Sequence, residues 1–313
     1  MLYTLFYILI FPGFLFVSCF GLFAEFIDRK LYARMQNRVG PPWFQPVADF
    51  IKLIAKEEVI PSAANPRMFE AAPLFSLASC VCAFLYIPLW RVGSLSPFNG
   101  DLIVVLYLLT IPTLSFFIGG WYSTSLFSRI GSVRCLSQLF AYEVPLFMSI
   151  LSCALLANTW SFSQVIAFYR AHPGLWLVNI LGFGVSLVAL LGKLEKVPFD
   201  IPEAETEIVA GVFTEYSGRR LALLRLTLDI ELVVGSALLA AVFLPFGFCC
   251  GPLWGFIFFI IKVLLIIALL SLCRTVFSRL RIDQMINFCW KVLVPIALVQ
   301  LVINLVIKGV IFR

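Results

Sequence analysis

Long apolar stretches, separated by polar connections of unequal length, dominate the hydrophobic pattern of this chain. A helix needs about 20 apolar residues to cross the roughly 30 Å hydrocarbon core of a bilayer. The charge-free run from residue 232 to 261 is divided by Pro245, Gly247, Gly251 and Pro252. We therefore predict eight membrane spans, near residues 2–26, 72–90, 102–127, 144–168, 174–192, 229–247, 252–272 and 292–311.

The composition supports a lipid-embedded protein. Of the 313 residues, 62% are hydrophobic and 13% are charged, whereas a soluble domain is about half apolar and a quarter charged. A soluble enzyme, a disordered chain and a free nucleic-acid binder are excluded. The first 24 residues carry no charge and show no obvious cleavage site, so we expect a membrane helix there and not a signal peptide. The predicted fold is a single all-α membrane domain over residues 1–313.

The charges are distributed unevenly between the two sides of this topology. The loops after spans 1, 3, 5 and 7 contain 18 of the 23 Lys and Arg residues, and four lie on the other side. This asymmetry predicts a multi-pass protein of the cell membrane, with these loops in the cytoplasm and both termini outside. Of 17 carboxylates, only Asp101 falls on the outer side. A face rich in both positive and negative charges indicates a docking surface for another protein.

The loop after span 1 combines a basic cluster with an amphipathic segment. Beyond the break at Gly40-Pro41-Pro42, apolar and polar positions alternate at helical spacing. The apolar positions are Phe44, Val47, Phe50, Ile51 and Ile54, and the polar ones are Gln45, Asp49, Lys52 and Lys56. We expect this helix to lie in the membrane interface. On charge alone, the basic cluster is equally explained as a positive-inside anchor.

The loop after span 5 contains five carboxylates: Asp200, Glu203, Glu205, Glu207 and Glu215. Asp200 has the spacing of a helix cap, with Pro202 in the first turn. Glu203 and Glu207 would then share one helix face, and like charges in a partly dry site raise each other's pKa. The alternative is a solvated acidic loop paired with the arginines of the first loop.

Five ionisable residues fall within or at the edge of predicted spans. Glu25 ends the first span, Glu143 opens the fourth, Asp229 opens the sixth beside Glu231, and Lys262 is near the middle of the seventh. A charge at the bilayer centre costs on the order of 2.5–3.5 kcal/mol on insertion scales. These residues are candidates for an ion path. A structural ion pair for Lys262, and an interfacial position for the acids, are the alternatives.

The sequence offers little for bond chemistry by this chain alone. It has nine cysteines without a CxxC pair and a single histidine, and no nucleophile–base pair, phosphate loop or nucleotide fingerprint. We therefore expect no metal or cluster bound by the chain. The pattern favours a membrane unit that links a change of charge at its basic face to ion movement.

Several segments, in order, resemble the family of respiratory complex I subunit 1, the H subunit. They are Asp28-Arg29-Lys30, Gln36-Asn-Arg38-Val-Gly40-Pro41, Gln45-Pro-Val-Ala-Asp49-Phe-Ile-Lys52-Leu, Lys56-Glu57-Glu58, Tyr142-Glu143, Phe199-Asp200-Ile-Pro-Glu203-Ala-Glu205, Glu215-Tyr216 and Arg279-Leu-Arg281-Ile-Asp283-Gln284. Two features depart from quinone-reducing members: the short Gly40-Pro-Pro-Trp-Phe-Gln45 connection, and Asp28 where the family typically has Glu. The short connection and Glu215-Tyr-Ser-Gly218 are more similar to the subunit of energy-converting [NiFe] hydrogenases, formate hydrogenlyases and the archaeal sulfur-reducing complex.

The resemblance implies a hetero-oligomeric membrane anchor between a peripheral electron-transfer arm and antiporter-like membrane subunits. Fe–S clusters and a NiFe or related centre would reside in the partner subunits. The resemblance implies an acidic path of Glu25, Glu143, Glu203, Glu205, Glu207 and Glu215, and it places Asp200 in the loop cavity. With Asp229 and Lys262, which their positions in the predicted spans single out, these are the candidate proton-path residues. The implied arm-docking residues are Asp28, Arg29, Lys30, Arg34, Arg38 and Asp49. Three alternatives stay open: the quinone-site subunit of a true complex I, a stand-alone ion transporter, and a purely structural anchor.

Overall fold

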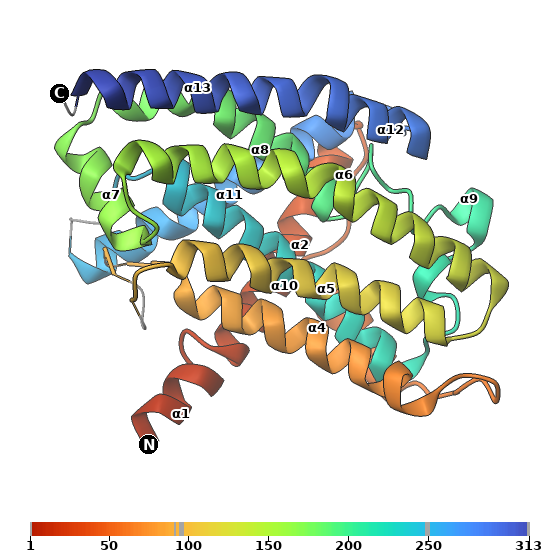
Figure 1. The fold of residues 1–313 in the computed structure, drawn as a ribbon. Helices are drawn as coiled ribbons and strands as arrows, with labels where there is room; N and C mark the ends of the chain where they lie inside the picture. The colour runs from red at the N-terminus through yellow and green to blue at the C-terminus, as the bar shows by residue number, and fades with distance from the viewer. Residues whose placement is uncertain (1, 91, 94–96, 248–250, 312–313) are drawn as a thin grey trace.

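A computed structural model describes all residues except 1, 91, 94–96, 248–250 and 312–313. The described chain forms helices and connecting loops without a strand, and eight of its helices are long and apolar enough to cross a membrane. The predicted all-α membrane fold is confirmed. Figure 1 shows these helices side by side, with most of them running between two ends of one bundle.

Some spans are continuous helices and others are jointed. The continuous ones are α4 (Pro66–Tyr86), α5 (Asp101–Tyr122), α6 (Leu126–Ala157), α10 (Gly218–Phe243) and α11 (Pro252–Val276). The jointed ones are α1 with α2 (Leu2–Leu9, Phe14–Met35), η1 with α8 (Leu175–Asn179, Ile180–Lys193), and α12, η3 and α13 (Ile282–Phe288, Cys289–Leu293, Val294–Ile311). The shorter elements are α3 (Gln45–Ala55), α7 (Phe162–Ala171), α9 (Glu205–Ile208) and η2 (Gly211–Phe213).

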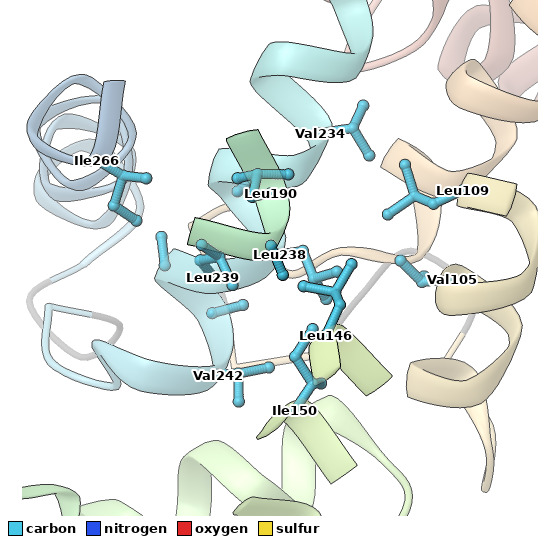
Figure 2. Close-up of a cluster of buried hydrophobic side chains, with 14 of the residues drawn as sticks. Val105, Leu109, Leu146, Ile150, Leu190, Val234, Leu238, Leu239, Val242 and Ile266 are labelled. Atoms are coloured by element: carbon cyan, nitrogen blue, oxygen red, sulfur yellow. The ribbon is translucent and has the colours of Figure 1, made fainter. Parts of the chain in front are cut away.

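Helix α10 is at the centre of the bundle. In its apolar stretch 89% of the residues are buried, against 22% for the span at Ile282–Val310, and α10 packs against α2, α4 and α11. Figure 2 shows the core around it, where Val234 and Leu238 of α10 face Leu109 of α5, Leu146 of α6 and Leu190 of α8. A helix apolar on all sides suits this position because it is surrounded by other helices.

Two helices extend beyond the apolar stretches from which the spans were predicted. The span expected at 144–168 is wrong in its second half. Helix α6 begins at Leu126 and ends at Ala157, where Asn158 adopts a left-handed φ of 56°, and the rest of the expected span falls in the turn and in the separate helix α7. The span expected at 229–247 begins at Gly218. In both cases, helical turns carrying arginines precede the apolar part. Hydropathy marks the membrane-embedded part of a helix, and the backbone continues beyond it.

The expected cap at Asp200 is wrong. Helix α9 begins at Glu205, after Ala204, and residues 201–204 form a turn. Tertiary bonds hold the preceding backbone, because Gln138 Nε2 donates to Phe199 O at 2.8 Å and Arg279 Nη2 donates to Asp200 O at 2.7 Å. A cap would need Asp200 next to the first helical turn.

Gly218 joins the two long loops. Its φ is +58°, and a Cβ at this position would lie 2.9 Å from Lys56 O and 3.0 Å from Glu57 O. Only glycine meets both constraints without a shift of the backbone. Ser217 Oγ accepts from Val59 N at 2.9 Å and so bonds the same segment. The chain from 56 to 59 is therefore fixed against the start of α10.

The connections lie at two ends of the bundle, which we call the basic end and the opposite end. The basic end contains the connections 36–65, 123–125, 194–217 and 277–281, and the opposite end contains 158–174 and the described parts of 87–100 and 244–251. Figure 1 shows the basic end on the right, around α9, and the opposite end on the left, around α7 and the C-terminus. The cytoplasmic location of the basic end stays a prediction.

Candidate functional site: an ionic cavity at the basic end

A cavity of about 450 Å³ opens at the basic end between α2, α3, α10, α11 and the connection from α8 to α9. Its polar wall is formed by charged side chains of both signs from all five segments. They are Glu25, Arg29, Asp49, Glu195, Lys196, Asp200, Glu203, Arg225, Asp229 and Arg274. The rest of the wall is apolar, with Leu22, Phe50 and Leu226 among its members.

Lys196 is the central cation of this wall. Its Nζ donates to Glu25 Oε2 at 3.0 Å and to Asp28 Oδ2 at 2.5 Å. Asp28, 1% exposed, also accepts from Ser271 Oγ at 2.5 Å and from Arg274 Nη1 at 3.0 Å. Burial opposes the charge of Lys196, but the carboxylates of Asp28 and Glu25 outweigh it and raise the pKa of this lysine. These bonds tie α2 to α11 through the loop that begins after α8.

A second series of bonds leads from the cavity to α3. Arg29 bridges Glu25 Oε1, at 2.8 Å from Nε, and Asp49 Oδ2, at 3.1 Å from Nη1. Gln45 Nε2 donates to the other oxygen of Asp49 at 2.8 Å. Helix α3 forms as the sequence predicted and exposes Val47, Ile51 and Ile54. Its position in a membrane interface stays a prediction.

The acidic loop contributes less to the cavity than the sequence suggested. Asp200 and Glu203 line it, and Glu203 receives both of its bonds from Arg225 Nη1, at 3.0 and 3.1 Å. Glu207 is exposed and pairs with Arg134 at 2.5 Å, and this hydrogen bond lowers the pKa of Glu207. Glu203 and Glu207 bond arginines of two different helices, so they do not form the shared acidic face expected.

Three other predicted residues, Glu215, Lys262 and Glu143, lie outside the cavity wall, and the side chain of a fourth, Glu205, lies outside the described residues. Glu215 is half-buried. Lys262 is 3% exposed, and its Nζ donates to Leu244 O at 3.1 Å and to Phe246 O at 3.0 Å, next to the end of α10. Half-buried Glu143 lines a second, water-sized cavity of about 10 Å³ between α5 and α6. An ion-path role for Lys262 and Glu143 stays a prediction.

The predicted docking residues beyond Arg29 and Asp49 are divided between the interior and the surface. Asp28 is buried in the ionic wall, and Lys30 Nζ donates to Pro41 O at 3.4 Å. Arg34 and Arg38 are exposed at the basic end. Arg34 and Arg38 can therefore contact a partner protein without rearrangement.

The sequence analysis assigned no site role to Lys193, Glu195 or Lys196, and it noted Glu231 only as one of the charges at the edges of predicted spans. Lys193 Nζ lies 2.6 Å from Glu231 Oε1, and the two side chains are 2% and 0% exposed. Burial, followed by the negative charge of Glu203, raises the pKa of Glu195 to about 8. The sequence did contain a signal for the pair of Lys193 and Glu231. Lys193 ends one apolar span and Glu231 lies within another, and a charged side chain in lipid needs a counter-charge.

This geometry is that of a helical membrane protein of one particular class. Its members have a cavity at one end that is lined by both acidic and basic side chains, and further charged residues are buried in the bundle beyond it. The chain belongs to the NADH dehydrogenase family, whose model matches residues 7–305. It is 36% identical over 310 residues to the H subunit of NADH-quinone oxidoreductase from Dehalococcoides mccartyi, covering 97% of this chain and 86% of that protein. The same subunit from Bacillus thuringiensis is 34% identical, with 94% and 90% covered.

A solved structure has the same fold. A chain of the membrane-bound sulfane sulfur reductase, an archaeal respiratory membrane complex, superposes with a TM-score of 0.81 at 24% identity. The match covers 92% of this chain and 96% of that one. The resemblance to the complex I H-subunit family is therefore confirmed by sequence and by fold, and the chain is a membrane subunit of a respiratory complex.

Proposed function

We propose that this chain anchors an electron-transferring arm at its basic end and couples redox turnover there to proton or sodium movement. The observation that carries the proposal is the ionic wall of the cavity. Acids and bases from α2, α3, α11 and the connection from α8 to α9 contact one another there, and Arg225 of α10 contacts Glu203 of the same connection. The protonation of these carboxylates should respond to a change of charge nearby, because several carboxylates share the cations that stabilise them.

The energetic requirement is modest. Moving one elementary charge across 100 mV costs about 2.3 kcal/mol, which is comparable to a shift of about 1.7 pKa units in one carboxyl.

The electron carriers, Fe–S clusters and a NiFe or related centre, would be held by the partner subunits. Antiporter-like membrane subunits would carry the ions. The exposed Arg34 and Arg38 would contact the arm.

Ion uptake by inverted membrane vesicles that contain the whole complex tests the coupling role. The donor is whichever of NADH and reduced ferredoxin the wild-type vesicles oxidise. We expect Asp229→Asn to retain donor oxidation and to lose most ion uptake, because a cavity carboxylate is removed without a large change in volume. The exposed Glu57→Gln is the matched control. Full ion uptake by Asp229→Asn would refute the coupling role.

A second candidate is supported by the curated relatives, which are named as quinone oxidoreductase subunits. In that case the same cavity would admit a quinone. Added decyl-quinone and a quinone-site inhibitor separate the two: quinone-stimulated, inhibitor-sensitive donor oxidation supports the second candidate. Quinone-independent oxidation supports a hydrogenase-like or sulfur-reducing complex. The co-purifying large subunit, with nickel or with a flavin, distinguishes them independently.

A further inference from the structure

Helix α3 presents an exposed apolar face on the side away from the large cavity. Phe44, at its N-terminal cap, and Val47, Ile51 and Ile54 within it are 41–59% exposed. The side chains that line the cavity come from the rest of the helix: Pro46, Asp49, Phe50 and Leu53. Helix α3 is therefore the wall between the cavity and its surroundings, and so many exposed apolar side chains on one face mark an interaction surface.

The depth of α3 along the bundle identifies these surroundings. Residues 1–24 carry no charge, and Arg29, which follows them closely in α2, donates to Asp49 of α3 at 3.1 Å. On α10, against which α3 also packs, the charge-free run begins at residue 232, and Asp229 lines the same cavity as Asp49. Helix α3 is thus level with the border between the apolar and charged parts of two spans. At this depth an amphipathic helix lies in the headgroup region, with its apolar face in the acyl boundary.

The charges beside this face select the kind of lipid. Asp49 is the only acid in the segment 34–56, and it is bonded by Arg29. The same segment contains four exposed cations, none of which forms an ion pair with a described residue: Arg34, Arg38, Lys52 and Lys56. Basic residues next to an interfacial helix are attracted to anionic lipids. Lysine stems also lie along apolar surface while the ammonium reaches the headgroups.

We propose that α3 is a docking surface for anionic phospholipid. The acyl chains contact its apolar face, and the headgroup phosphates bind the ammonium groups of Lys52 and Lys56. Because Asp49 of the same helix is bonded by Arg29, lipid bound to α3 supports one wall of the large cavity from the outside. An acidic protein on the same face is the competing occupant, and the test distinguishes it.

Photo-cross-linking in the whole complex tests this docking. The complex is placed in nanodiscs of phosphatidylcholine and phosphatidylglycerol in equal amounts, with a trace of one lipid that carries a photoreactive group in its acyl chain. Mass spectrometry then measures the labelling of α3 by each lipid. We expect both lipids to label α3, with a preference for phosphatidylglycerol. In the double variant K52Q/K56Q this preference should fall about fivefold for each lysine, while labelling by phosphatidylcholine persists.

Three variants control for indirect effects. Lys291→Gln removes another exposed cation near the basic end, outside α3, and should leave the preference unchanged. Glu57→Gln removes the exposed acid that follows Lys56 and should not lower the preference. Ile51→Asn interrupts the apolar face and should reduce the labelling of α3 by both lipids.

Each outcome decides the proposal. Equal labelling of the wild type by the two lipids, or an unchanged preference in the double variant, would overturn the role of the headgroup. If neither lipid labels α3, a protein covers the face and the lipid docking is wrong. If the double variant does not accumulate, the wild type at high salt replaces it, because salt screens exposed charges. The preference for phosphatidylglycerol should then fall, and a preference that salt leaves unchanged would overturn the proposal.

Discussion

The two ends of α8 join two buried polar clusters of opposite character. At the opposite end, Asn179 Oδ1 accepts from Asn304 Nδ2 at 2.8 Å and from Gln300 Nε2 at 3.1 Å, and Asn179 Nδ2 donates to Tyr169 OH at 2.8 Å. This amide cluster is uncharged. At the basic end, Lys193 ends the helix against Glu231, and the chain continues directly to Glu195 and Lys196.

The difference separates neutral groups that join helices from groups that can change their charge. In the amide cluster, Asn304 also donates to Ser152 O at 3.0 Å, so hydrogen bonds from α13 reach both α6 and the η1 turn that precedes α8. Neutral amides have no proton to exchange near neutral pH. Glu195 and Lys196 border the large cavity and Lys193 borders the small one. Glu195 Oε2 and both Glu231 oxygens lack hydrogen-bond partners among the described residues. Titratable groups are thus concentrated at the basic end of α8, beside the large cavity, and neutral amides at the other end.

The largest effect in this comparison is expected from Asp28→Ala. The change removes the carboxylate that Lys196, Ser271 and Arg274 share, and leaves two cations without it. Breaking a buried pair by removing one partner costs about 3–5 kcal/mol, so the assembled complex should be nearly absent from membranes. Quantitative immunoblotting and native electrophoresis measure this. Asp28→Asn keeps the volume and should accumulate better, and wild-type levels for Asp28→Ala would contradict the structural role of the ionic wall.

A smaller effect is expected from Asn304→Ala in the amide cluster. The loss of hydrogen bonds between membrane helices costs about 0.6–1.7 kcal/mol for each interaction. The midpoint of thermal inactivation of the purified complex should therefore fall, while ion uptake per donor oxidised stays at the wild-type value. Leu305→Ala, on the exposed side of the same helix, is the matched control. A loss of coupling in Asn304→Ala would erase the distinction between the two clusters.

The pH response of Glu195 sharpens the comparison without changing the fold. Its pKa of about 8 lies above the ordinary 4.5, so the folded chain holds an extra proton between these values. The stability from this group is fully present below about pH 4.5 and is lost as the pH rises towards 8. Infrared difference spectra should show a protonated carboxyl band that disappears through about pH 8. The band should be missing in Glu195→Gln, and its persistence there would assign it to another group.

The sequence predicted the fold more fully than the site. Span number and the presence of α3 follow from apolar length and helical spacing, which are local properties. The cavity depends on which charges meet, and tertiary geometry decides that. Lys196 is 168 residues from Asp28 along the chain, and the arginines that hold Glu203 and Glu207 come from α10 and α6. The run of acidic residues made the loop after span 5 the main candidate in the sequence. The fully buried Glu231, by contrast, lies in the apolar part of α10, outside any such run.

Glu207→Gln is expected to have the smallest effect. The side chain is 52% exposed and pairs with Arg134, itself 24% exposed, and such pairs contribute under about 1 kcal/mol. Because the hydrogen bond from Arg134 lowers the pKa of Glu207 below 4.5, its contribution is present above that pH and is lost as the pH falls through the lowered value. At neutral pH, donor oxidation and ion uptake should match the wild type.

Glu203→Gln is the variant to compare with it, since Glu203 borders the cavity and is 20% exposed. A loss of ion uptake in Glu207→Gln that equals the loss in Glu203→Gln would mean that the whole acidic loop acts as one unit, and that the cavity wall alone does not define the coupling site.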